Sequence, residues 1–447
     1  MEKIGLIGAT AIGLGAIIGA GIFVLSGVAI TLSGTGAILA FLLTGVVAIL
    51  VAFEVGELSS RMPNETGASY SFTYNVFGSE LGFMTGILRL LSFVAAIAAI
   101  SVGFGSYLSS FLNLNSAYSP LFSIILILVL GYITNKGVRK AARTDTVLVT
   151  FKVLVLIIFI VFGIYVGKAS NLTISDIFSG SNLGGIFAAS VLSMFAYAGF
   201  QSIASITPFL KGGGKTAAKA IILSVLISAV LYMGVTVAML MLAPKSAYAL
   251  SGDPLSVALS AVNAPGALTV LIDIAAMVAT ASATLAMLVG CEMLLFQMAK
   301  DGLLPSILKS DKNSKNPEKN SLITTMLLGI GFIFAGNLYI IAAISNFGTI
   351  FSYLINSIAI IKIRTLEKSG KAKNLLRSMN MKNVRLFLTP AYPYIPILAT
   401  FMLLIFFIGF PAEALAGGVI TILLSIFVYY MIEQIKEKPI IKVKLFK

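Results

Sequence analysis

The side chain best suited to chemistry in this 447-residue sequence is Lys152, within the apolar stretch Val149-Thr150-Phe151-Lys152-Val153-Leu154. A lysine inside a membrane costs roughly 2.5–3.5 kcal/mol on insertion scales, so an intramembrane ionisable group is a candidate for function by default. Because desolvation favours the neutral amine, such a lysine can gain and lose a proton near neutral pH. The structural alternative is that the long side chain snorkels to the cytoplasmic interface.

Five other charged or polar side chains fall within apolar stretches. Asp273 and Arg89 can line a permeation path or satisfy a packing network, and the structural role is favoured for both. Gln201 can contact a substrate or a gate. Glu54 and Glu292 lie toward the cytoplasmic ends of their predicted helices, so we expect them to be interfacial.

Other catalytic or metal chemistry has little support. The chain has no histidine and one cysteine, Cys291, so it lacks the commonest metal ligand and proton shuttle and cannot form an intrachain disulfide. No spaced acids indicate a metal site, and the predicted coupling ion is a proton with no other cofactor. The stretch Gly212-Gly213-Gly214-Lys215-Thr216 imitates a phosphate-binding loop, but the first glycine of that motif is replaced by Phe209.

The elements that must position these groups are membrane-spanning helices. Hydrophobic residues make up 58% of the chain and charged residues 11%, with a mean hydropathy of +1.02. A soluble domain of this size needs more charged residues to form a hydrated surface. The first apolar segment is predicted to be a retained helix and not a signal peptide. Twelve spans are predicted, near 7–33, 36–58, 81–111, 120–134, 145–167, 184–209, 217–243, 267–297, 320–336, 338–362, 390–410 and 412–434.

The net charge of +14 is distributed as a topology signal. With the N-terminus inside, the cytoplasmic side receives the basic residues after spans 4, 6, 8 and 10 and the lysines of the C-terminal tail, whereas the opposite side receives only Lys168 and Lys245. Both termini are therefore predicted to be cytoplasmic, and the natural partner of the charge is the lipid bilayer and its anionic headgroups. Nucleic-acid binding is disfavoured.

Two predicted spans carry glycines near their middle. Span 1 contains the run Gly13-Leu14-Gly15-Ala16-Ile17-Ile18-Gly19-Ala20-Gly21-Ile22-Phe23, and span 6 contains Phe195-Ala196-Tyr197-Ala198-Gly199-Phe200-Gln201. Irregular backbone at membrane depth is tolerated only against protein or a watery cavity. Interrupted spans at corresponding positions of two halves indicate an inverted-repeat transporter. The alternative is close packing of small residues between helices.

Such breaks suit a zwitterionic solute. The N-terminus of a half-helix presents free N–H groups and a positive dipole end to a carboxylate, while unwound carbonyl groups can receive an ammonium.

At this point the sequence resembles the amino acid–polyamine–organocation family of transporters. The run Gly15-Ala16-Ile17-Ile18-Gly19-Ala20-Gly21-Ile22-Phe23 is similar to the family signature G-x-x-I-G-x-G-I-F. Further motifs in register are Glu57-Leu58 with Pro63 and Gly67, Ala299 to Pro305, Ile344 to Thr349, and Arg364. One departure is the segment after span 6, where Pro208 and Lys211-Gly212-Gly213-Gly214-Lys215 replace the usual acidic residues and Asn-Pro pair.

The resemblance implies an all-α membrane protein of LeuT-like fold, a single transporter domain over 1–447. It implies two inverted repeats (about 7–167 and 184–362) with peripheral helices over about 390–434, and discontinuous helices 1 and 6. By matching position, the substrate carboxylate would meet the N–H groups of Gly19, Ala20 and Gly21. The ammonium would meet the carbonyls of Ile17, Phe195 and Ala198, beside Gly199 and Phe200. Phe195 matches an aromatic lid, with an ordinary buried phenylalanine as the alternative.

The resemblance also gives Lys152 a role. It matches a span-5 lysine of proton-coupled members, whose ammonium stands in for the sodium ion of sodium-coupled relatives. Its partners would be the Gly15 carbonyl and Ser282. Protonated Lys152 would tie span 5 to spans 1 and 8 and hold the outward-competent arrangement, and proton loss on inward opening would release the tie.

The expected function is proton-coupled import of amino acids across the cell membrane, with neutral substrates and broad selectivity because the predicted pocket is apolar. An amino-acid exchanger and a cationic amino-acid or polyamine transporter are alternatives on the same fold, the latter through Asp273. A membrane-embedded enzyme and a channel are the alternatives of a different class. The sequence leaves the preferred amino acid and the oligomeric state open.

Overall fold

The computed structural model describes residues 3–62, 65, 67–135, 142–172, 182–248, 251–309, 318–369 and 386–437. Regular structure in this part of the chain is helical, apart from an isolated bridge between Ile4 and Leu210. Helices dominate because a membrane offers no partners for backbone N–H and C=O groups, so each long apolar run must satisfy its own hydrogen bonds. The protein is a multi-pass α-helical membrane protein.

The first half of the chain contains one interrupted and several continuous helices. Its elements are α1 (Leu6–Ile17), α2 (Ala20–Phe23), α3 (Ser26–Ser33), α4 (Gly36–Arg61), α5 (Ser69–Phe77), α6 (Ser79–Phe111), α7 (Ser119–Asn135) and α8 (Ala142–Val166). Glycines with positive φ separate neighbouring helices: Gly34 (φ +56°) ends α3, and Gly78 (φ +97°) lies between α5 and α6. Glycine is favoured at these turns because it has no Cβ to clash.

The second half of the chain likewise contains one interrupted helix and several continuous ones. Its elements are α10 (Leu183–Tyr197), the 3-10 turn η4 (Ala198–Phe200), α11 (Gln201–Ser205), η5 (Thr207–Phe209), α12 (Gly214–Leu242), α13 (Pro254–Ser260), α14 (Gly266–Lys300), α15 (Lys319–Phe332), α16 (Leu338–Lys368), α18 (Tyr394–Phe406), η8 (Phe407–Gly409) and α19 (Ala412–Glu437).

Ten of the described helical segments are long and apolar enough to cross a membrane. They correspond in order to predicted spans 1–8, 10 and 12. Most of their ends lie within about six residues of the predicted ones, but the first segment ends at Phe23, ten residues before the predicted end, and the separate helix α3 covers the rest. Predicted spans 9 and 11 correspond to α15 and to the apolar segment Tyr394–Gly409, which are shorter than the other spans. Several basic segments that carried the orientation signal (136–141, 310–317, 370–385 and 438–447) lie outside the described residues, as does Pro63.

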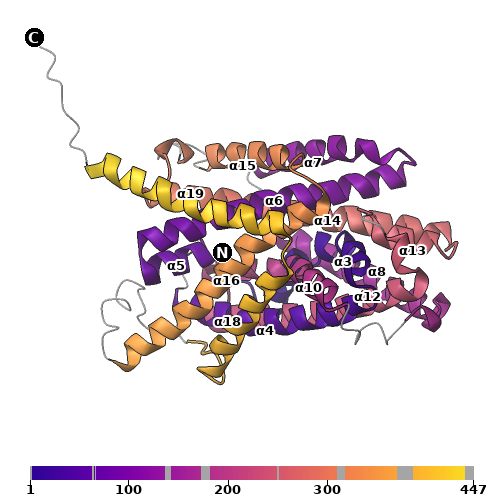
Figure 1. Cartoon of the computed structure of the whole chain (residues 1–447), viewed down its shortest axis with the longest axis horizontal. Helices are drawn as coiled ribbons and strands as arrows, with labels where there is room; N and C mark the ends of the chain where they lie inside the picture. Colours follow the sequence, from indigo (N-terminus) through magenta and orange to yellow (C-terminus); the bar gives the residue numbers. More distant parts are fainter. Residues whose placement is uncertain are drawn as a thin grey trace, which may run out of the picture.

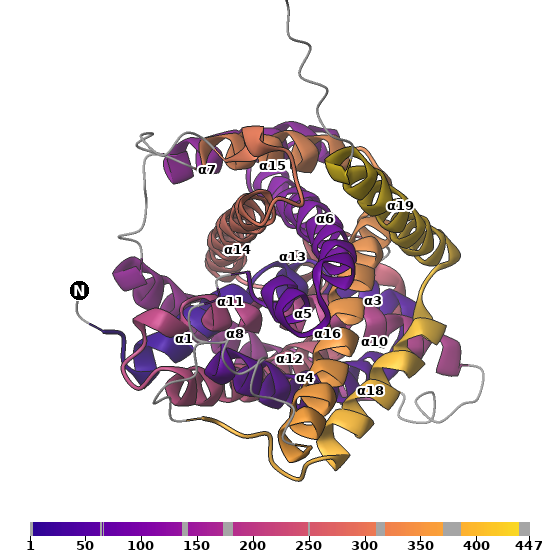
Figure 2. The same ribbon diagram turned by 90° about the vertical axis from the view of Figure 1, so that its left-hand side faces the viewer.

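The long helices run roughly parallel to one axis of the molecule (Figure 1). Seen along that direction, α7 and α15 lie side by side at one edge, α6 and α14 lie next to them, and α1, α4, α8 and α12 form the opposite part (Figure 2). The largest apolar cluster joins α1, α4, α10, α12 and α16, and a second joins α6, α7, α14 and α15. The two interrupted spans pass through the first cluster.

Two short helices were not predicted as separate elements. Helix α5 packs against α6 and α16, and α13 packs against α12 and α14. Both are too short to span a membrane. They connect spans and supply side chains to buried polar contacts, which include Ser69 on α5 and Ser256 on α13.

Candidate functional site

The first span is broken between Ile17 and Ala20. The N–H of Ile18 still bonds to the Leu14 carbonyl at 2.7 Å, but the N–H of Gly19 turns back to the Ile17 carbonyl at 2.9 Å. The helix then resumes with α2 at Ala20. Because the first N–H groups of any helix have no acceptor within that helix, the break leaves backbone donors at the start of α2. These donors belong to Ala20 and Gly21, two of the predicted carboxylate-binding positions.

The sixth span changes winding where the sequence placed its break. Helix α10 ends at Tyr197, the turn η4 covers Ala198–Phe200 with 3-10 geometry, and α11 begins at Gln201. A second 3-10 turn, η5, ends the span. The helix therefore changes from α to the tighter 3-10 geometry at this position, whereas the sequence predicted a break. Short 3-10 stretches within a helix often mark hinges or sequences under strain.

The two irregular regions lie directly against each other. A methyl group on Gly199 would clash with the carbonyl group of Ala16, and one on Gly21 would clash with the backbone of Ala196. A methyl group on Gly19 would come 2.6 Å from the Cβ of Ala283 on α14. Gly199 and Gly21 leave no room for a Cβ because they lie against backbone, and Gly19 leaves none because it lies against the Ala283 side chain. The irregular parts of spans 1 and 6 thus lie together as one candidate site, which α14 borders.

Tyr232 on α12 bridges the two irregular regions. Its hydroxyl lies 2.8 Å from the Ile17 carbonyl and 3.1 Å from the Ala196 carbonyl. The side chain is fully buried. In this conformation the Ile17 carbonyl, a predicted ammonium partner, therefore accepts hydrogen bonds from Tyr232 and from the Gly19 N–H. Sequence reasoning missed Tyr232, whose only signal was a tyrosine within an apolar helix.

The aromatic residues of span 6 differ in their surroundings. Phe195 is half-buried and packs against both apolar clusters. Phe200 is fully buried, and its ring stacks on Tyr353 of α16 with centroids 5.5 Å apart. The Tyr353 hydroxyl lies 3.5 Å from the Ala198 carbonyl. Of the two rings, Phe195 is therefore the more accessible. Phe200 packs the turn η4 against α16.

Lys152 lies in the interior against the first break. Its side chain is 1% exposed, so the amine does not snorkel to an interface. The Nζ atom lies 3.4 Å from the Gly15 carbonyl, 3.3 Å from the Ile18 carbonyl and 2.5 Å from Ser282 Oγ. Carbonyl groups at the end of α1 favour a cation there, because they lie at the negative end of the helix dipole. The structure thus brings Lys152 together with Gly15 and Ser282, the two partners associated with it above.

Asp273, Arg89 and Gln201 lie outside this cluster in the described part of the chain. Asp273 on α14 accepts a hydrogen bond from Ser256 of α13. Arg89 on α6 donates to Thr349 Oγ1 at 3.1 Å, and its guanidinium lies 4.6 Å from the centre of the Phe93 ring. Gln201 donates from Nε2 to Ser69 Oγ at 2.8 Å. All three side chains are buried and make contacts between helices.

Glu54 differs from the expectation. It was predicted to be interfacial, but the structure buries it completely and places its Oε2 2.6 Å from Ser357 Oγ on α16. This complete burial was not predicted, because position along a helix does not show which face neighbouring helices cover. Glu292, placed in the same class, is also buried, at 6% exposure.

A charged network joins α4, α16 and the segment before α18. The Glu57 carboxylate accepts from Arg61 Nε at 2.8 Å, from Arg364 at 2.6 and 3.0 Å, and from the Thr389 N–H at 2.7 Å. Arg61 also contacts Glu367 at 2.6 Å. Both Glu57 and Arg364 belong to motifs recognised in the sequence, whereas Arg61 was missed although it follows Glu57 at the helical spacing of four residues.

Two further contacts join the same end of the molecule. The N–H of Ile4 bonds to the Phe209 carbonyl at 3.0 Å, and the N–H of Lys211 bonds to the Ile4 carbonyl at 2.8 Å, so the start of span 1 is paired with the end of span 6. Tyr70 on α5 donates to Asp301 at 2.7 Å. Burial and the Asp301 carboxylate both raise the pKa of Tyr70 above its ordinary value.

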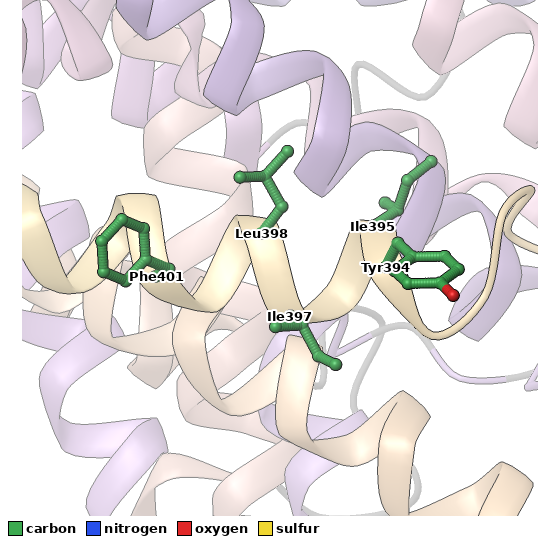
Figure 3. A pocket seen from close by; sticks show the side chains of 5 residues that line it. All are labelled: Tyr394, Ile395, Ile397, Leu398 and Phe401. Carbon is green, nitrogen blue, oxygen red and sulfur yellow. The ribbon is translucent and has the colours of Figure 1, made fainter.

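A hollow on the outer surface lies apart from these residues. It is lined by five residues of α18, namely Tyr394, Ile395, Ile397, Leu398 and Phe401 (Figure 3). Its lining is almost wholly apolar, and Phe401 is 60% exposed. None of its residues belongs to either interrupted span, so this hollow is not part of the candidate site.

Comparisons with known proteins identify relatives over almost the whole chain. A family profile described as amino acid permease matches residues 4–432. The chain is 30% identical to the methylthioribose transporter of Bacillus subtilis, over 94% of this chain and 91% of that protein. It is 27% identical to the branched-chain amino acid permease BcaP of the same bacterium, over 98% and 94% of the two chains. It is 29% identical to the vacuolar cationic amino acid transporter 2 of Arabidopsis thaliana, over 79% and 58%.

Proposed function

The chain belongs to the amino acid permease family, and we propose that it imports neutral amino acids across the cell membrane by proton symport. Its family membership makes it a transporter of amino acids or related solutes and not an enzyme. The observation that carries the proton-coupled proposal is the position of the Lys152 amine between two carbonyls of the broken span 1 and Ser282 of α14.

The proposal includes a LeuT-like fold of twelve spans with two inverted repeats, about 7–167 and 184–362, and peripheral helices over about 390–434. Corresponding helices of the proposed repeats pack in pairs: α4 with α12, α6 with α14, and α7 with α15. Such pairing is expected when a pseudo-two-fold axis relates the two repeats. The irregular regions of spans 1 and 6, which also correspond, lie against each other.

In the proposed substrate site, the carboxylate binds the N–H groups of Gly19, Ala20 and Gly21 at the start of the second half of span 1. The ammonium binds carbonyls of Ile17, Phe195 and Ala198, next to Gly199 and Phe200, and Phe195 covers the substrate. In the present structure the Tyr232 hydroxyl donates a hydrogen bond to the Ile17 carbonyl. We expect it either to share this carbonyl with the ammonium or to rotate away when substrate binds.

The apolar surroundings of the site favour neutral substrates, and a branched-chain amino acid permease among the relatives supports this choice. The second candidate is a cationic substrate. It is favoured by the buried carboxylate of Asp273 and by the cationic amino acid transporter among the relatives. Methylthioribose is the substrate in the name of another relative, so solutes related to amino acids belong in the same test.

Proton coupling follows from what the charge of Lys152 does to helix contacts. Protonated Lys152 donates to span 1 and to Ser282 and ties α8 to α1 and α14. The neutral amine has fewer protons to donate, so the tie weakens and α1 can move away from α8. Because a charged amine is costly in an apolar interior without acceptors, the proton is lost when these helices separate. Binding and release of the proton are thereby coupled to the change of conformation.

We propose that both termini are cytoplasmic, because that orientation places the basic loops on the inner side. The membrane is then the cell membrane, as the bacterial relatives suggest. Under this orientation the Glu57 network and the Ile4–Phe209 pairing lie on the cytoplasmic side. Both must rearrange, or move as units, when the site opens inward.

The test is uptake of labelled amino acids by the purified chain in proteoliposomes, with pH and sodium gradients imposed separately. We expect an inward proton gradient to drive accumulation of leucine or alanine, a sodium gradient to be ineffective, and a protonophore to abolish uptake. Uptake that requires amino acid inside the vesicles would identify an exchanger instead. Preference for arginine or a polyamine would favour the cationic alternative.

A further inference from the structure

A second buried ionisable group, Glu54 on α4, is not used by the mechanism above. Its side chain is fully buried, seven residues before Arg61 at the end of its helix. At 1.5 Å per residue this position lies roughly 10 Å from the helix end. Glu54 bonds to Ser357 of α16, whereas the Lys152 amine bonds to carbonyls at the end of α1 and to Ser282 of α14.

The Glu54 carboxyl group has one hydrogen-bond partner in the part of the chain that the structure describes. Oε2 lies 2.6 Å from Ser357 Oγ, and Oε1, although buried, has no partner among those residues. An ionised carboxylate with an unpaired buried oxygen is highly unfavourable unless a cation compensates it. The surroundings of Glu54 therefore decide which protonation state it can hold.

No described cation is placed to compensate Glu54. On its own helix, Glu57 is a like charge one turn away, and Arg61 is bound to Glu57 and Glu367. On α16, Arg364 is bound to Glu57, Lys362 is exposed and donates to the Val76 carbonyl, and Lys368 is exposed. On α12, Lys215 and Lys219 are exposed, and the described helices α3, α10, α11 and α18, which also pack against α4, contain no lysine, arginine, aspartate or glutamate.

The hydrogen bonding of Ser357 fits a neutral carboxylic acid. Its Oγ lies 2.6 Å from Glu54 Oε2 and 3.2 Å from the Tyr353 carbonyl. A serine hydroxyl has one proton to donate. If Glu54 is protonated, it donates to Ser357, and Ser357 donates to Tyr353, so both contacts are satisfied at once. If Glu54 is ionised, the single Ser357 proton can be donated either to the carboxylate or to the Tyr353 carbonyl, and the other contact is left without a hydrogen bond.

The same turn of α16 contacts the irregular part of span 6. Tyr353 stacks on Phe200, and its hydroxyl lies 3.5 Å from the Ala198 carbonyl. Asn356, next to Ser357, donates to Ser69 Oγ at 2.9 Å, and Ser69 also accepts from Gln201. A change in the charge of Glu54 would therefore act on the helix turn that holds the substrate break.

We propose that Glu54 is a second proton-binding residue, protonated while α4 and α16 are packed together and deprotonated when water reaches it from the cytoplasmic side. The carboxylate takes its proton from water and returns it to water, with Ser357 as its hydrogen-bond partner. This inference deepens the proposed function, because the second proton would move in the same transport cycle as that of Lys152.

The test is infrared difference spectroscopy of the full chain in lipid membranes, which detects the carbonyl stretch of a neutral carboxylic acid without requiring transport. We expect such a band at neutral pH in the wild type, its loss in Glu54→Gln, and a shift to higher frequency in Ser357→Ala, where a hydrogen bond is removed. Asp273→Asn and Glu292→Gln identify any bands of these other buried acids, while Glu57 is paired with two arginines. Because glutamine matches the shape of a neutral glutamic acid, thermal unfolding of Glu54→Gln should be unchanged.

The proposal is overturned if no band is lost in Glu54→Gln, or if the band persists at all pH values when a substrate gradient drives turnover. In transport, the proton-to-substrate ratio should fall by one proton in Glu54→Gln, and an unchanged ratio would also overturn it. If the wild type shows no proton-coupled uptake while the Glu54 band is present, the symport proposal fails and the protonation of Glu54 stands.

Discussion

Gly199 lies so close to Ala16 that any side chain on Gly199 would clash with the Ala16 carbonyl group. These residues lie in the interrupted parts of spans 1 and 6, 183 positions apart in a chain whose halves are proposed to be inverted repeats. Their contact means that neither interruption is an isolated packing defect. Each presents its backbone to the other, and the substrate proposal depends on this juxtaposition.

Gly199→Ala should therefore abolish uptake and lower thermal stability, because overpacking of a close contact typically costs about 1–3 kcal/mol. The measurements are proteoliposome uptake and the unfolding temperature in detergent. Gly184→Ala is the matched control, since a methyl group at that position of the same span meets no atom within 4 Å. Normal uptake by Gly199→Ala would mean that the two breaks need not touch.

Tyr232→Phe removes the hydroxyl that bonds to the Ile17 and Ala196 carbonyls. We expect a loss of stability of about 1 kcal/mol, as for one net hydrogen bond, and a severalfold change in KM because the Ile17 carbonyl, the proposed partner of the substrate ammonium, loses its neighbour. Tyr248→Phe is the control, since its hydroxyl bonds to the Met239 carbonyl away from the breaks. It should lose similar stability with KM unchanged. Equal KM values in the two variants would show that the Tyr232 hydroxyl has no part in substrate binding.

Glu57→Gln should strongly destabilise the protein, because Glu57 is fully buried and accepts from two arginines. Removing one partner of a buried ion pair typically costs about 3–5 kcal/mol. Glu367→Gln should cost less, about 0–1 kcal/mol as for exposed pairs, since Glu367 is 30% exposed. The measurement is thermal unfolding of both variants in detergent. Equal unfolding temperatures would show that Glu57 does not hold the network together.

Much of the architecture could be predicted from hydrophobic runs and glycines. The interruptions near Gly19 and Gly199 were anticipated because glycine weakens a helix where lipid offers no substitute hydrogen bonds. The neighbours of Lys152 followed from a family resemblance and not from periodicity. Contacts between residues far apart in the sequence, such as those of Lys152, were therefore predictable only from the family resemblance.

Other features could not be predicted, for identifiable reasons. The burial of Glu54 depends on which neighbouring helix covers its face, and Ser357 lies 303 positions away in the sequence. Tyr232 resembles any interfacial tyrosine until its hydroxyl is seen between two carbonyls. The short helices α5 and α13 lack the length that makes a span visible in the sequence.

The most direct test of the account is pH-gradient-driven uptake by Lys152→Ala in proteoliposomes, compared with Lys168→Ala, which removes an exposed lysine beyond the end of the same helix. Coupling free energies of about 1–3 kcal/mol correspond to roughly 5–150-fold effects, and we expect a loss of accumulation in that range. The remaining uptake by Lys152→Ala should no longer respond to the pH gradient, whereas Lys168→Ala should behave as the wild type. Full pH-gradient-driven accumulation by Lys152→Ala would contradict the role proposed for Lys152 as the proton carrier.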